Sequence, residues 1–185
     1  MNIIIFAGIS VIGYGYIRET FYFYRHSMKY LFLSISLLFM SVYGMTQTAL
    51  NEEMFFKAIS SNSLSEMQSS LKMVVNSGSK DKEAFEGAML MRMADKVSVP
   101  AKKMAQFKQG HKKLEKAIAA NPNNATYRFL RLMIQENAPR ALGYHKDIAE
   151  DSRFVAANNK SVSAAVQHAI TGYSKKSKAL SGGDL

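Results

Sequence analysis

Beyond residue 46, apolar residues recur every three or four positions, and this spacing constrains the fold more than any other feature of the chain. Leu64, Met67, Leu71 and Val74 show it clearly. Such spacing places apolar side chains on one face of a helix. No segment alternates apolar and polar residues for long enough to predict a strand. The sequence therefore predicts an all-α fold, a bundle of antiparallel helical hairpins joined by short loops.

Start and stop signals divide this region into separate helices. Ser63 and Glu66 form a capping box, and Pro100 suits the first turn of a long helix. Helices are expected at about 51–60, 63–76, 81–96, 100–120, 124–137, 146–157 and 161–173. Together they form a helical domain over residues 47–174. Residues 175–185 are basic and then Gly-rich, and we expect a flexible tail there.

Residues 28–46 have the features of a secretory signal peptide. Lys29 is followed by an apolar run over residues 31–40, which is too short to span the roughly 30 Å hydrocarbon core as a helix. Val42 and Gly44 suit the residues that precede a signal-peptidase cut. We therefore expect the protein to be exported, to the periplasm or the extracellular space, after cleavage. The alternative is that the N-terminal apolar segments remain as a membrane anchor.

Residues 1–27 do not fit the signal-peptide interpretation. They contain a second apolar stretch, over residues 3–17, which glycines interrupt. Arg18 and Arg25 separate this stretch from the run that follows Met28. We favour a wrongly assigned translation start, with Met28 as the true one. The alternative is a two-segment membrane hairpin with its basic loop in the cytoplasm.

The composition limits the chemistry that this protein can perform. Cysteine is absent, which excludes disulfides, a thiolate nucleophile and Cys-based metal sites. The formal net charge of +10 indicates attraction to anionic partners. The signal segment argues against nucleic acid as the natural partner. The basic residues also lack the interleaved aromatic side chains that stack on bases.

Residues 110–125 resemble the second helix and exit turn of a tetratricopeptide repeat. Gly110, Leu114, Ala117 and Pro122 match the small, large apolar, small and proline positions of that family. The resemblance implies that the small residues let a neighbouring helix approach closely. It covers about 16 residues, and no second copy follows at the family's period of about 34 residues. It therefore implies helical-hairpin packing without a full superhelix.

The expected helix at 100–120 carries a row of lysines on the arc opposite its apolar face. They are Lys102, Lys103, Lys112, Lys113 and Lys116. These lysines are candidate contacts for an anionic lipid or polymer surface in the cell envelope. The alternative is a solvated face that keeps the protein soluble.

Arg128 and Arg131 lie on the most apolar of the expected helices. Long cations on such a helix need partners, because burying an unpaired charge is costly. Asp147 and Asp151, together with Glu150, follow on the next helix. We expect a structural ion-pair network between the two helices. A binding site for a carboxylate or phosphate ligand is the alternative.

No residue pattern predicts a catalytic, metal or cofactor site. His111, His145 and His168 share no ligand spacing. The Met-x-Met-x-Met run at 89–93 favours core packing over copper binding, because residues two apart point to different faces of a helix. His145 and Asp147 have no nucleophile motif beside them. The sequence thus predicts an exported, non-enzymatic interaction or scaffold protein with an unidentified protein partner. Binding of an anionic surface is the first alternative, and an enzyme with an unrecognised site is the second.

Overall fold

Seven α-helices and two 3₁₀ turns form the part of the chain that the structure, a computed structural model, describes: residues 50–181 and residue 183. No strand occurs in that part, so the predicted all-α class is confirmed. The elements are α2 (Glu52–Ser60), α3 (Leu64–Asn76), α4 (Lys82–Ala94), α5 (Pro100–Ala120), α6 (Ala125–Asn137), η1 (Arg140–Leu142), α7 (Ile148–Asn158), η2 (Asn159–Ser161) and α8 (Ala164–Ser174). None of these helices is long and apolar enough to cross a membrane. The predictions for residues 1–46 lie outside the described residues.

Polar side chains set the starts of four helices. Asn51, Ser63, Asn124 and Ser163 each accept a hydrogen bond from the backbone N–H three residues further on. Such a bond satisfies one of the otherwise unpaired donors of a helix start. The last helix therefore begins after Ser163, not at residue 161 as expected.

The antiparallel pair α4 and α5 is the closest contact in the fold, and glycine makes it possible. A Cβ atom at Gly110 would lie 2.5 Å from the carbonyl oxygen of Gly87, and one at Gly87 would lie 2.7 Å from that of Gly110. Any side chain at either position would push the two backbones apart. The sequence predicted close approach at Gly110, but it did not identify Gly87 as the opposing residue.

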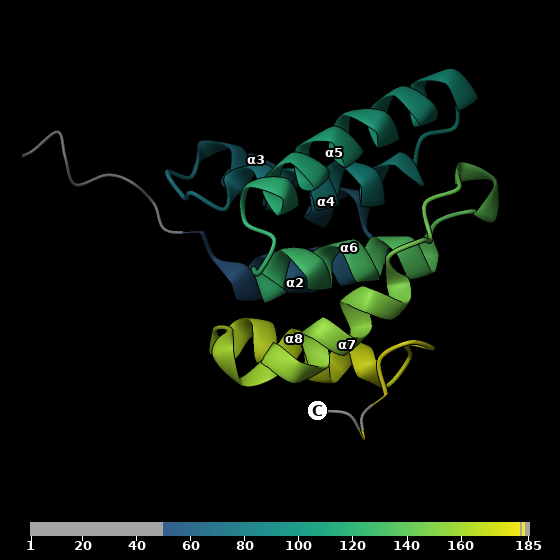
Figure 1. The fold of residues 1–185 in the computed structure, drawn as a ribbon. Coiled ribbons are helices and arrows are strands. Elements are labelled where there is room, and N and C mark those ends of the chain that lie inside the picture. The colour runs from purple at the N-terminus through teal and green to yellow at the C-terminus, as the bar shows by residue number, and fades with distance from the viewer. Residues whose placement is uncertain (1–49, 182, 184–185) are drawn as a thin grey trace, which may run out of the picture. The chain divides into compact units, whose positions relative to one another are not determined.

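Helix α6 lies at the centre of the described part of the chain. Figure 1 shows it between the α4–α5 pair and the α7–α8 pair, and it packs against all four helices. Phe129, Leu130 and Leu132 are completely buried, and each contributes about 1.5–3 kcal/mol by leaving water. The ring of Phe129 lies 5.6 Å from that of Phe56 and 5.8 Å from that of Tyr173. Helices α2 and α8 therefore share this core.

The segment after α8 is held against the protein, which differs from the expected flexible tail. Leu180 is 1% exposed and belongs to the core. The carboxylate of Glu136 on α6 accepts hydrogen bonds from the backbone N–H groups of Lys178 and Ala179, at 2.9 and 3.0 Å. It also accepts one from the hydroxyl of Ser177, at 2.6 Å. A buried leucine and one carboxylate thus fix residues 177–180, although their composition is typical of a loose end.

Candidate functional site

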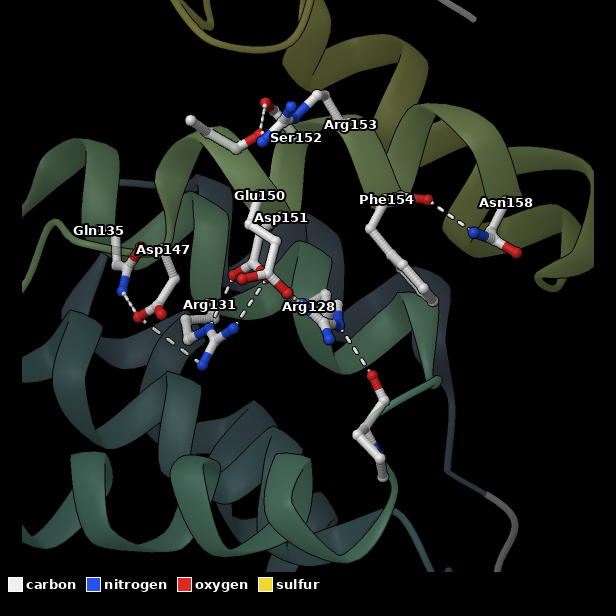
Figure 2. A network of polar contacts seen from close by, with 12 residues as sticks. Arg128, Arg131, Gln135, Asp147, Glu150, Asp151, Ser152, Arg153, Phe154 and Asn158 are labelled. Atoms are coloured by element: carbon white, nitrogen blue, oxygen red, sulfur yellow. Dashed lines mark hydrogen bonds and ion pairs between the residues drawn. The ribbon is translucent and has the colours of Figure 1, made fainter.

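Arg131 and Asp151 form the centre of a buried ion-pair network between α6 and α7. Nε of Arg131 donates to Oδ2 of Asp151 at 2.7 Å, and its Nη2 donates to Oδ1 at 2.8 Å. Asp151 is completely buried, and Arg131 is 7% exposed. The two parallel hydrogen bonds give this pair the bidentate geometry that makes arginine–carboxylate contacts strong. Figure 2 shows both side chains between the two helices.

Arg128 lies one helical turn before Arg131 and extends the network. Its Nη1 donates to Glu150 at 2.7 Å and to Oδ1 of Asp151 at 3.0 Å. Its Nε donates to the carbonyl oxygen of Pro122 at 2.8 Å. Its guanidinium carbon lies 4.6 Å from the centre of the Phe154 ring, which adds a cation–π contact (Figure 2).

Glu115 connects this network to α5. One carboxylate oxygen accepts a hydrogen bond from Nη1 of Arg131 at 3.1 Å, and the other accepts one from the hydroxyl of Tyr144 at 2.5 Å. Burial, together with this hydrogen bond to Glu115, raises the pKa of Tyr144 above its usual range. Burial opposes the charge of Arg131, but its bonds to Asp151 outweigh that effect and raise the pKa of its guanidinium. The side-chain amide of Gln135 donates a hydrogen bond to Asp147 at 3.0 Å, which adds both residues to the network.

The network occupies all three guanidinium nitrogens of Arg131 and two of the three of Arg128. Every guanidinium nitrogen of Arg131 has a carboxylate partner within the protein. An anionic ligand at this place would have to displace Asp151, which would leave that carboxylate buried and unpaired. The contacts therefore support a structural role for the expected pairs more strongly than a ligand site.

The five candidate lysines on α5 do not form one uniform surface. Three of them pair with acids at α4: Lys103 with Asp95 at 3.4 Å, Lys113 with Glu86 at 3.2 Å, and Lys116 with Glu83 at 3.0 Å. The hydrogen bond from Lys116 lowers the pKa of Glu83. Lys102 and Lys112 are exposed and make no ion pair with any carboxylate that the structure describes. The continuous basic arc that the sequence suggested is thus partly neutralised.

A cavity of about 260 Å³ opens between α5, α6 and the end of α4. We call it the α5–α6 groove. Its apolar lining includes Met91, Met104, Phe107, Ile134, Pro139 and Leu142. Met104 is 38% exposed. The lining of the groove is mainly apolar, and the sequence did not predict it.

Helices α5 and α6 diverge from the turn that joins them. Figure 1 shows the two helices meeting at the end of α5 and separating toward its start. Tyr144 fills the space between them near α5: its ring lies 4.7 Å from that of His111 and 5.8 Å from that of Phe107. Gly143, with φ +63°, turns the chain so that Tyr144 can enter. On the other side of Phe107, toward Met104, no side chain closes the space, and the groove remains.

The other residues that the sequence raised have local partners. His145 shares a hydrogen bond with the carbonyl oxygen of Ala138, and Ser152 donates to that of Ala149. Met89 and Met91 are buried in the core. Over residues 50–181, no group of three or more His, Asp or Glu side chains is arranged to hold a metal ion.

Comparison with models of known protein families, with curated protein sequences and with solved structures finds no match to this chain.

Proposed function

We propose that this chain is an exported, non-enzymatic helical protein that binds a partner protein through the α5–α6 groove. The observation that carries the proposal is the open apolar cavity next to the partly exposed side chain of Met104. Apolar openings rimmed by polar residues are typical of interaction sites. The hairpin packing of α4 on α5 and the tetratricopeptide-like residues 110–125 are consistent with an interaction role.

The size and openness of the groove suit side chains of a partner protein. A cavity of about 260 Å³ that is open to solvent suits one or two large apolar side chains. Such anchors, buried in a pocket, supply most of the binding energy of protein interfaces.

A selection from a random peptide library tests the proposal. The protein is immobilised, and bound peptides are counter-selected against the variant Met104→Glu, which puts a charge at the mouth of the groove. We expect the surviving peptides to share large apolar residues. Met54→Glu is the matched control, because Met54 is a 50% exposed methionine on α2, outside the groove. Peptides that bind both variants as well as the parent would contradict the proposal.

Export is tested separately. The short apolar run after Lys29 and the small residue Gly44 motivate a mature N-terminus between Met45 and Thr48. N-terminal sequencing of the native exported protein measures it. An intact N-terminus upstream of Leu31 would contradict cleavage.

Binding of an anionic lipid or polymer surface is a second candidate, and the exposure of Lys102, Lys108 and Lys112 supports it. Exposed charges are screened over about 8–10 Å at physiological ionic strength, so such binding must weaken steeply with salt. Co-sedimentation with anionic vesicles measures it. Changing these three lysines to Gln should abolish the binding, and equal binding by the parent and this variant would rule out the lysine face.

A further inference from the structure

We propose that three exposed lysines of α5 bind a linear polyanion, an extended chain of negatively charged groups. The lysines are Lys102, Lys108 and Lys112, and we call them the lysine face. None of them lines the α5–α6 groove, so the two surfaces are separate. The inference rests on the second candidate function and names its ligand as an anionic chain, not a lipid surface.

The geometry of α5 gathers these lysines on one side of the helix. With about 3.6 residues per turn and about 1.5 Å of rise per residue, they lie within an arc of about 120° and about 15 Å along the axis. Every residue of that arc along α5 is exposed; besides the lysine face it holds Ala101, Ala105, Gln109, Lys116, Ala119 and Ala120. The arc therefore contains no carboxylate and no aromatic side chain.

Four carboxylates lie on α5 or pair with its lysines, and none of them pairs with the lysine face. Glu83, Glu86 and Asp95 pair with lysines of α5 outside that face, at 3.0, 3.2 and 3.4 Å. Glu115 accepts hydrogen bonds from α6 and from the segment before α7. Within residues 50–181, the three lysines thus have no carboxylate partner, which the sequence alone could not show.

The spacing of the lysines also favours an anionic ligand. Lys108 and Lys112 lie four residues apart, a separation at which like charges destabilise a helix. An anionic group between the two ammonium groups would replace this repulsion by two attractions. Lys116, four residues further on, already has a partner in Glu83. Lys108 and Lys112 are therefore the neighbouring pair that a ligand would stabilise most.

The packing of α5 favours a chain over a membrane surface. A helix that binds a bilayer lays its apolar face into the boundary between headgroups and acyl chains. The apolar face of α5 is already buried: Leu114, Ala117 and Ile118 belong to the core. Figure 1 shows α5 along one edge of the described part of the chain, with α4 and α6 on its inner side. An extended chain can follow its outer side, and release of the counterions of that chain favours binding.

Long-chain inorganic polyphosphate is a suitable probe, because lysines bind as point charges and do not select one acid group by geometry. We would label it with a fluorophore and measure its anisotropy with the full protein. For three contacts, the logarithm of the affinity should fall with that of the salt concentration at a slope of about −2, which is at least about tenfold between 50 and 200 mM. Triphosphate cannot reach from Lys102 to Lys112, and we expect it to compete at least about tenfold more weakly.

Two triple variants with the same net charge locate the binding site. The first changes Lys102, Lys108 and Lys112 to Gln. The second changes three other exposed lysines to Gln; they pair with no carboxylate that the structure describes, and they are Lys57, Lys72 and Lys160. We expect the first variant to lose the salt-dependent binding and the second to bind like the parent. Thermal unfolding confirms that both are folded.

The outcomes separate the inference from the functions proposed above. Equal weakening in the two triple variants would overturn it, because net charge alone would then explain the attraction. Triphosphate that competes as well as the long chain would overturn the linear ligand. Anionic vesicles that bind through the lysine face while polyphosphate does not would overturn the inference but leave the second candidate function intact. If neither binds, both fail, and the α5–α6 groove remains to be judged by the peptide selection.

Discussion

Tyr144 donates a 2.5 Å hydrogen bond to one carboxylate oxygen of Glu115, and Arg131 donates to the other oxygen at 3.1 Å. One carboxylate on α5 thus holds both the segment before α7 and the central helix α6. The same contact holds Tyr144, whose ring lies 5.8 Å from that of Phe107, a residue that lines the α5–α6 groove. The ion-pair network and the groove are therefore connected through the contact between Tyr144 and Phe107.

The tyrosines make the stability of this protein sensitive to alkaline pH. Burial, with hydrogen bonds to carboxylates, raises the pKa of Tyr127, Tyr144 and Tyr173 above the usual value of about 10. Above pH 10 the unfolded chain loses these protons and the folded chain keeps them. Stability contributed by the neutral tyrosines is therefore complete below about pH 10 and lost as the pH rises further. Tyr144→Phe should make the decline in unfolding free energy between pH 9 and pH 11 shallower, as measured by urea denaturation. An unchanged slope would show that Tyr144 ionises normally.

Arg131 should matter far more to stability than Arg128. Arg131→Met leaves Asp151 buried without its bidentate partner, and we expect a loss of about 3–5 kcal/mol in the free energy of unfolding. Arg128→Met leaves both bonds from Arg131 to Asp151 intact, so we expect about 1–2 kcal/mol. Urea denaturation of the two variants measures the difference. Equal and small losses would mean that the network does not hold α7 to α6, and a ligand role for the arginines would gain support.

The close contact between Gly87 and Gly110 predicts that alanine lowers the stability of the protein at Gly110 but not at Gly172. Gly110→Ala places a Cβ 2.5 Å from a backbone carbonyl oxygen, and we expect a loss of about 1–3 kcal/mol as α4 and α5 separate. Gly172→Ala is the control, because a Cβ at that position in α8 meets nothing within 4 Å. It should be neutral, or stabilising by up to about 1 kcal/mol. Thermal melting of both variants checks this, and a stabilised Gly110→Ala would refute the close approach.

The segment after α8 should resist proteases as long as Leu180 and Glu136 hold it. Glu136→Gln removes the charged acceptor of two backbone N–H groups. Leu180→Ala removes a completely packed side chain, at a cost of about 2–5 kcal/mol if the segment stays folded, or less if it simply detaches. Both variants should show faster carboxypeptidase digestion than the parent, followed by mass spectrometry. Glu53→Gln, an exposed change on α2, is the control. Equal digestion of all four proteins would show that the segment is already loose.

Local signals in the sequence predict the helices well and their mutual arrangement poorly. Ser63 and Asn124 mark helix starts because capping depends on residues within one turn. Gly110 indicates a close approach, but nothing in the sequence around Gly87 identifies it as the opposing residue, because that pairing depends on how α4 and α5 align. The burial of Leu180 escapes prediction for a similar reason: its neighbours are basic and Gly-rich, and Glu136, which holds residues 177–179 beside it, lies on another helix.

In the candidate site, too, the sequence predicts individual residues better than their arrangement in space. Arg128 and Arg131 can be predicted to need acids, since long cations on an apolar helix require partners. The groove cannot be predicted, because its cavity depends on the divergence of α5 from α6 and on the entry of Tyr144 between them. The one local signal is Met104: its spacing from Phe107 and Leu114 predicts the apolar face of the helix, yet it is 38% exposed.

The central claim is that the α5–α6 groove receives apolar side chains of a partner protein. Methionine methyl groups report on it directly, because Met91 and Met104 line this groove and Met54 and Met73 line the hollow between α2 and α3. We would label the methionine methyl carbons with ¹³C and titrate a peptide from the library selection into the protein by NMR. The account predicts that the signals of Met91 and Met104 shift with a saturating dependence on peptide, while those of Met54 and Met73 stay in place. Shifts confined to Met54 and Met73, or no shifts at saturating peptide, would contradict it.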